Sequence, residues 1–223
     1  MIPRIEIDSY LEPLLLEAAR KLDLEFEIHH LPPQLPRVDH ISITAILGEK
    51  EQAVTYPTIK NSFRNNRLSS FFAKPNSDSK FKEYESMQAK TLEEIKKQRV
   101  SGTATARFNA AGEFINLTSG IDRGAIWSCE FAYTSIFENA VRAAYGLPLG
   151  SSELTDTDWV LCEFDASAEL EMRHPYLHLF AHNPKYRIRK LGSHRGYVAI
   201  SDEENLAEEV FHAVDYLEGL ISE

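Results

Sequence analysis

Apolar residues recur along the N-terminal part of the chain with two different spacings. Between residues 8 and 22 they fall three or four positions apart, which places them on one face of a helix. Residues 24–31 and 38–47 instead alternate apolar and polar side chains, and three prolines separate these two runs. The patterns predict one helix followed by two strands.

The middle of the chain combines one ambiguous stretch with two well-defined elements. Residues 51–77 are polar and aromatic, which fits either short helical turns or an ordered loop. Residues 78–98 predict a weakly amphipathic helix at the surface. Residues 103–108 and 113–118 alternate around an Asn-Ala-Ala-Gly turn, so we expect them to pair as an antiparallel hairpin.

The C-terminal half mixes helical and strand patterns. Its predicted elements are a helix at 127–146, strands at 159–164, 176–181, 186–191 and 196–200, and a terminal helix at 202–221. We therefore predict a single α+β domain over residues 1–223. In this domain a largely antiparallel sheet carries flanking helices, which include the N- and C-terminal helices.

Composition excludes several classes of protein. A chain of 223 residues that is 43% hydrophobic can bury a full core. The N-terminus lacks the features of a signal peptide, and no apolar run is long enough to span a membrane. Cys129 and Cys162 make no disulfide framework or zinc motif, so we expect two buried free thiols. These features indicate a cytoplasmic protein without membrane association.

Charge is segregated along this chain, whose formal net charge is −10. Residues 52–77 and 172–201 contain no acid but hold ten of the 24 Lys and Arg residues. One interpretation is a positive surface on an acidic body. The other is that these cations pair with acids that the fold brings near them.

Half of the eight histidines lie in residues 173–198. His174, His178 and His182 are spaced by four, which places them on one face of either a helix or a strand. Arg173, His174 and His178 also have the R-H-x-x-x-H form that the HEPN nuclease family carries on a helix. A proline after His174 would then lie inside that helix, where it is destabilising by about 3 kcal/mol.

Two further chemistries are open to the same histidines. Glu163 and Asp165 on the preceding strand could bind a metal ion together with His178. The sequence has no tight ligand pair, and six nearby cations would repel a metal ion, so we predict neither metal nor cofactor. The other chemistry is an anion site in which His178 transfers a proton and His174 assists it.

In that anion site, four basic residues would hold phosphate: Arg173, Lys185, Arg187 and Arg189. Fixed cations and a proton shuttle are what a metal-independent ribonuclease needs. The alternative is that His178 is a half-buried strand residue and the arginines form a solvated face.

A second basic segment lies earlier in the chain. Lys60, Arg64 and Arg67 have helical spacing and are interleaved with phenylalanines, which suits backbone and stacking contacts with single-stranded nucleic acid. The alternative places these phenylalanines in the core, with the basic residues as their solvated neighbours.

Short motifs in the last third resemble a family of uncharacterised small bacterial proteins. The matching pieces are "CEFD" (162–165), "HPYLH" (174–178), "YRI" (186–188) and the helix around 211–217. The chain departs from the family pattern at Phe180 and Arg189. The resemblance implies a prokaryotic cytoplasmic protein from mobile-element or defence neighbourhoods.

Two functional hypotheses follow. The first is a protein acting on nucleic acid or nucleotide phosphate, an RNase-like component of a defence or toxin-type system that binds single-stranded nucleic acid or a nucleotide. The second is a non-catalytic accessory subunit, which binds a protein partner in a multi-component system through its acidic body and basic surface.

Overall fold

A nine-stranded sheet runs through the computed structural model, which describes residues 2–32, 38–49, 52–64, 67–72, 78–166 and 171–221. Its strands are β3 (His40–Leu47), β4 (Ala53–Thr55), β5 (Ile59–Arg64), β6 (Arg67–Phe72), β7 (Gly102–Phe108), β8 (Phe114–Ser119), β9 (Trp159–Asp165), β10 (Arg187–Lys190) and β11 (Arg195–Ser201). They follow the order β10-β11-β9-β6-β5-β3-β7-β8. The short strand β4 pairs with the second half of β3, and β5 pairs with its first half. All these pairs are antiparallel, which confirms the predicted α+β class.

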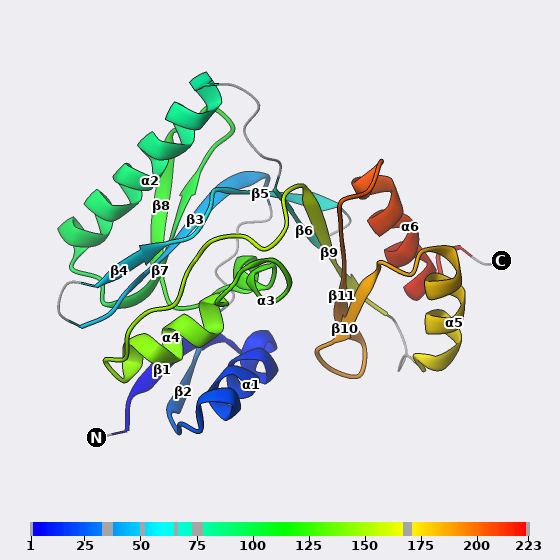
Figure 1. Cartoon of the computed structure of the whole chain (residues 1–223), viewed down its shortest axis with the longest axis horizontal. Coiled ribbons are helices and arrows are strands. Elements are labelled where there is room, and N and C mark those ends of the chain that lie inside the picture. Colours follow the sequence, from blue (N-terminus) through cyan, green and yellow to red (C-terminus); the bar gives the residue numbers. More distant parts are fainter. Residues whose placement is uncertain are drawn as a thin grey trace.

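Helices and a small second sheet surround these strands (Figure 1). The helices are α1 (Glu12–Leu22), α2 (Asp78–Gln98), α3 (Ser128–Phe131), α4 (Ile136–Ala144), α5 (Arg173–His182) and α6 (Leu206–Leu217), with the short 3-10 turns η1 (Ser9–Leu11) and η2 (Arg123–Ala125). The strands β1 (Arg4–Asp8) and β2 (Glu27–Leu31) flank α1 in the sequence and pair in parallel. Among the described residues, no helix is long and apolar enough to cross a membrane.

One face of the sheet, which we call the α4 face, covers the largest core. Even-numbered residues of β3 point to this face, and α1, α3 and α4 lie on this side. Trp159 of β9 stacks on Trp127, with 5.4 Å between ring centroids, and on Phe131, with 4.5 Å. Aromatic rings bury large apolar areas, so this stack anchors the α3–α4 segment on β9.

The opposite face, which we call the α2 face, carries two separate helical layers. Helix α2 covers β3 and β7, where Met87 packs against Ile43. Helix α6 covers β9 and β11, where Val210 and Val214 pack in a second cluster. Figure 1 shows α2 and α6 apart, with β5 and β6 between the strands that they cover.

Two buried ion pairs join distant strands on the α4 face. Asp122 pairs with Arg107 of β7, whose side chain is 0% exposed. The next residue, Arg123, donates from Nε to Glu163 of β9 over 2.9 Å and makes a second contact through its Nη2 atom. Burial raises the pKa of Glu163, whereas the Arg123 guanidinium lowers it. Asp122, the N-cap of η2, and Arg123, its first residue, therefore connect β7 to β9 through these ion pairs.

Most predicted elements are confirmed, including the hairpin of β7 and β8 and the helix α2. The ambiguous stretch 51–77 is neither a loop nor helical turns where it is described, because it forms β4, β5 and β6. The predicted helix 127–146 breaks into α3 and α4, because residues after Phe131 leave the helix and Ser135 caps a new one.

The predicted strand 176–181 is wrong, because residues 173–182 form the helix α5. Pro175 is its third residue, and the N–H groups of a first turn have no partner within the helix, so proline costs little there. The last helix is shorter than predicted and ends at Leu217, which leaves Leu220 exposed rather than inward.

We predict that Asp122→Ala lowers the free energy of unfolding by about 3–5 kcal/mol, because it leaves the buried Arg107 charge without its partner. The matched control is Asp165→Ala. It removes an Asp–Arg pair with Arg195 in which both side chains are about half exposed, and we expect a change of about 0–1 kcal/mol. Urea unfolding of both variants measures the difference, and equal losses would contradict a structural role for the buried pair.

We also predict that neither thiol reacts rapidly in the native protein. Cys162 is buried and Cys129 is half-buried, and burial raises the pKa of each thiol to about 12. The thiolate is the reactive form, so alkylation at pH 8 should be slow until the chain is denatured. Mass spectrometry of native and urea-treated samples tests this, and fast native labelling of either cysteine would refute it.

Candidate functional site

The predicted histidine site lies in a helix-to-helix contact. The histidines of α5 share one face, as their spacing predicts, and this face lies against α6. His178 stacks on Tyr216 with 4.0 Å between ring centroids, and His182 lies 4.9 Å from the His212 ring. Tyr216 is also 3.4 Å from Nδ1 of His174. These side chains therefore contribute to the packing of α5 on α6.

The predicted phosphate-binding cations have acidic partners from other parts of the fold. Their ion pairs are Lys185 with Glu203, Arg187 with Asp156, and Arg189 with Glu17. Arg173 lies exposed at the start of α5. The pairing interpretation of the charge segregation therefore describes these three cations.

The second basic segment does not form one stripe. Lys60 on β5 and Arg67 on β6 both point to the α2 face, but Lys60 is exposed whereas Arg67 is buried against Asp215 of α6 and the following Glu218. The side chain of Arg64 lies outside the described part of the structure. These residues are on two paired strands rather than on a helix, so the helical spacing does not describe how they lie.

The alternative metal site of Glu163, Asp165 and His178 does not form. Glu163 is held by Arg123, and Asp165 pairs with Arg195. Across the residues that the structure describes, no group of three or more His, Cys, Asp or Glu side chains could hold a metal ion.

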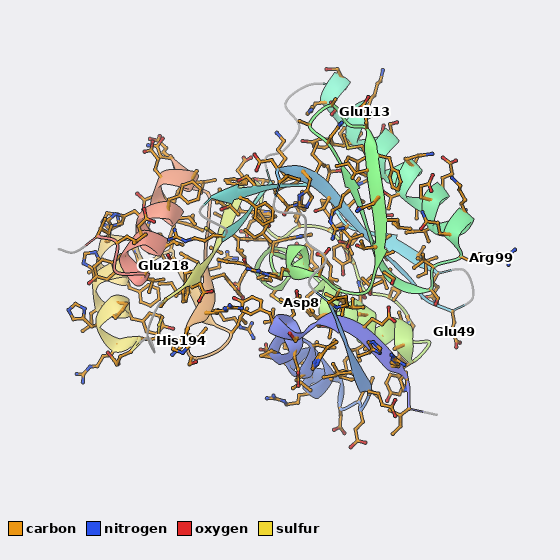
Figure 2. The ribbon with its side chains drawn as sticks, turned by 180° about the vertical axis from the view of Figure 1, so that it is seen from behind. Asp8, Glu49, Arg99, Glu113, His194 and Glu218 are labelled. Carbon is orange, nitrogen blue, oxygen red and sulfur yellow. The ribbon has the colours of Figure 1, made fainter. Side chains whose placement is uncertain are left out.

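A different site lies at the end of the β7–β8 hairpin that is opposite its turn. A partly open cavity of about 770 Å³ is lined there by β1, the end of β3, the α2–β7 junction, the end of β8 and α4. Figure 2 shows Arg99 and Glu49 near this edge of the molecule, with Asp8 at the end of β1 near the centre. The volume falls in the range of ligand pockets.

Two glycines shape the cavity wall. Gly102 and Gly120 adopt φ values of +74° and +81°, a region that side chains rarely tolerate. A Cβ atom on Gly120 would lie 2.3 Å from Leu31 and 2.9 Å from the Glu6 carbonyl. Glycine at this position therefore lets β1 and β2 approach the hairpin closely.

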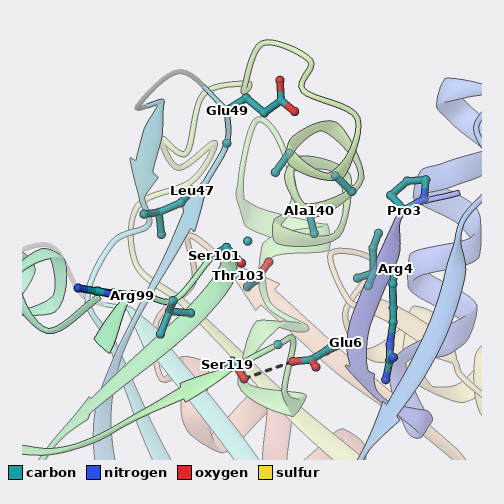
Figure 3. Close-up of a pocket in the computed structure, with 17 residues that line it drawn as sticks. Pro3, Arg4, Glu6, Leu47, Glu49, Arg99, Ser101, Thr103, Ser119 and Ala140 are labelled. Carbon is teal, nitrogen blue, oxygen red and sulfur yellow. Dashed lines mark hydrogen bonds between the residues drawn. The ribbon is translucent and has the colours of Figure 1, made fainter. Parts of the chain in front are cut away.

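Hydroxyl groups line the interior (Figure 3). Ser101 and Thr103 lie centrally among the labelled residues, and at the base Ser119 donates to Glu6 over 3.2 Å. Thr103 is only 7% exposed as a residue, and it lines the cavity. A polar group of this kind is available to a ligand.

The charged groups of the cavity lie around its sides. Arg4 and Arg99 occupy opposite sides, and Glu49 lies at the far end from Glu6 (Figure 3). Arg99 follows α2 in the left-handed conformation, with φ of 53°. The cavity therefore combines a neutral polar interior with two exposed arginines at its margins, of which Arg99 directs its guanidinium away from the interior in Figure 3.

Sequence reasoning missed these residues. The usable signal was a pair of Ser-Gly steps, at 101–102 and 119–120, which stand at the two open ends of the predicted hairpin. The antiparallel register brings both steps together, since Gly120 donates its N–H to the Thr103 carbonyl.

No family model and no curated protein matches the chain in sequence. The N5-carboxyaminoimidazole ribonucleotide synthetase from Thermus thermophilus shares the fold with a TM-score of 0.61 and 19% identity, over 85% of this chain and 52% of its own. The N5-carboxyaminoimidazole synthase from Aspergillus clavatus, solved in complex with ADP and 5-aminoimidazole ribonucleotide, gives 0.62 and 14%, over 81% and 52%. The glycinamide-RNase-transformylase T from Mycobacterium tuberculosis gives a TM-score of 0.60 and 14% identity, over 82% of this chain and 52% of its own.

These likenesses show that the chain shares an α+β fold with these enzymes. The chain spans about half the length of the solved structures that it matches. The comparison also corrects the functional hypothesis, because a fold shared with these enzymes does not support an RNA-binding nuclease of an antiviral defence or toxin-type system. The protein partner of the accessory-subunit hypothesis stays a prediction, and Lys185, Arg187 and Arg189 of its basic surface are engaged in ion pairs within the chain.

Proposed function

We propose that this chain binds a ribonucleotide in the cavity between β1, the β7–β8 hairpin and α4. The observation that carries the proposal is the hydroxyl-lined interior of this cavity, to which Thr103, a residue only 7% exposed, contributes. Structures with the same fold support this ligand class, since three of them are described as complexes with ADP.

The distribution of polarity fits such a ligand. Hydroxyls at 101 and 103 can bond the edge of a base or the hydroxyls of a ribose, both of which are neutral. Arg4 and Arg99 at the margins suit the phosphate oxygens, because a guanidinium matches their geometry. The apolar wall from α4, with Ala140 and Ala143, can cover one face of a ring.

Divalent metal fits this cavity poorly. Magnesium that accompanies nucleotide phosphates is usually held by one or two carboxylates. The cavity offers Glu6 and Glu49, which lie at opposite ends, and Glu6 already accepts a hydrogen bond from Ser119. The proposed binding therefore relies on arginine and includes no metal-dependent step.

We predict that isothermal titration detects saturable ADP binding, with the same affinity in EDTA as in Mg²⁺. Thr103→Val keeps the shape of the side chain but removes the hydroxyl, so the dissociation constant should rise about fivefold to tenfold, as expected for one hydrogen bond. The matched control is Thr118→Val, because the Thr118 hydroxyl bonds the Thr105 carbonyl and does not line the cavity. Absence of ADP binding to the wild type at millimolar concentration would end the proposal.

We also predict that Arg99→Gly separates ligand binding from stability. Glycine tolerates the left-handed conformation that is unfavourable for arginine by about 1–2 kcal/mol, so the variant should be at least as stable as the wild type. Its ADP affinity should fall several-fold because one cation is lost. Urea unfolding and titration measure the two effects, and Arg99→Lys should retain part of the affinity. Unchanged ADP affinity in Arg99→Gly would remove Arg99 from the site.

A further inference from the structure

A second cleft opens on the α2 face of the sheet, between the layer of α2 and the layer of α6. Its volume is about 360 Å³, and it is lined by parts of β3, β5 and β6, by Lys80 of α2 and by Ala110 of the hairpin turn. One cross-strand row passes through it, in which Ile41 of β3 pairs with Lys60 of β5 and Lys60 pairs with Phe71 of β6. Lys60 is thus a cation between two apolar neighbours.

Lys60 and Ser62 are the two side chains of the cleft that lack partners within the described chain. They are two residues apart on one strand, so both point to the α2 face. Neither has a hydrogen bond or an ion pair with any described residue. An ammonium group and a hydroxyl therefore stand side by side as free donors.

Other polar groups of the cleft are already engaged. Asp39 accepts the backbone N–H of Phe63, and Lys80 pairs with Glu83 over 2.7 Å. Asn61 donates to Ser42 and accepts from Ser70. Within the described lining, Lys60 and Ser62 therefore remain to select a ligand by its polar atoms.

We propose that this cleft binds a small carboxylic acid with an apolar body. The carboxylate would accept from the Lys60 ammonium and the Ser62 hydroxyl, which together match its two oxygens. Ile41, Phe71 and Ala110 provide apolar walls for the remainder of the ligand. The carboxylate of Asp39 in the same lining disfavours ligands with several negative charges.

This site is independent of the ribonucleotide cavity. Thr103 of β7 is on the α4 face, where it pairs with Ile46 of β3. Lys60 of β5 is on the α2 face, where it pairs with Ile41 of β3. The two sites share no lining residue among those described. Failure at one site can therefore be told apart from failure at the other.

The test is isothermal titration of the full chain with octanoate, and with octanol as the uncharged probe. We expect octanoate to bind the wild type, and Lys60→Met to weaken this binding at least tenfold while octanol binding stays the same. Lys60→Arg should restore part of the octanoate affinity. Lys82→Met, an exposed lysine of α2 outside the cleft, is the matched control and should bind octanoate like the wild type.

Two further measurements distinguish a local effect at the cleft from a general loss of ligand binding. ADP affinity should be the same in Lys60→Met and the wild type, and Thr103→Val should bind octanoate normally. If Lys60→Met unfolds, Ser62→Ala replaces it, with an expected severalfold loss of octanoate affinity. No octanoate binding to the wild type, or equal binding to Lys60→Met and the wild type, would overturn the proposal.

Discussion

The arrangement of this molecule depends on two consecutive residues that reach two distant strands. Asp122 holds Arg107 of β7, and Arg123 holds Glu163 of β9, although β3, β5 and β6 separate those strands. In a flat sheet four strand spacings would span roughly 19 Å, so twist and two long arginine side chains must close that distance. Ile121 beside them bridges to Ile7 of β1, which places β1 over the hairpin end and so creates the cavity that we propose as a ribonucleotide site.

The two proposed sites reflect how unequally the faces of the sheet are covered. On the α4 face, the glycine at 120 lets β1 and β2 come close, and a cavity with a hydroxyl-lined interior remains beside α4. On the α2 face, two helical layers belong to separate cores and leave Lys60 of β5 between them. Cavities at such junctions between layers are where ligands commonly bind.

Sequence patterns predicted elements whose signals are local. Helix α2 and the β7–β8 hairpin were recognisable because their periodicity and their turn lie within a short stretch. Strands β5 and β6 were not, because their polar positions are satisfied across strands, as Asn61 is by Ser42 and Ser70. The histidine spacing of α5 fits a helix and a strand equally. The partners that neutralise Arg187 and Arg189 lie 31 and 172 residues away, beyond any pattern along the chain.

The antiparallel pairing of β6 with β9 also bears on how the chain folds during synthesis. β6 ends at Phe72 and its partner β9 begins at Trp159. During synthesis, the backbone groups on that side of β6 therefore stay unpaired until nearly ninety further residues have been added. At ribosomal rates of about 5–20 residues per second, this delay lasts several seconds. Unpaired strand edges favour contacts with other chains, and the newly made protein therefore passes through a period in which it depends on chaperones or low concentration.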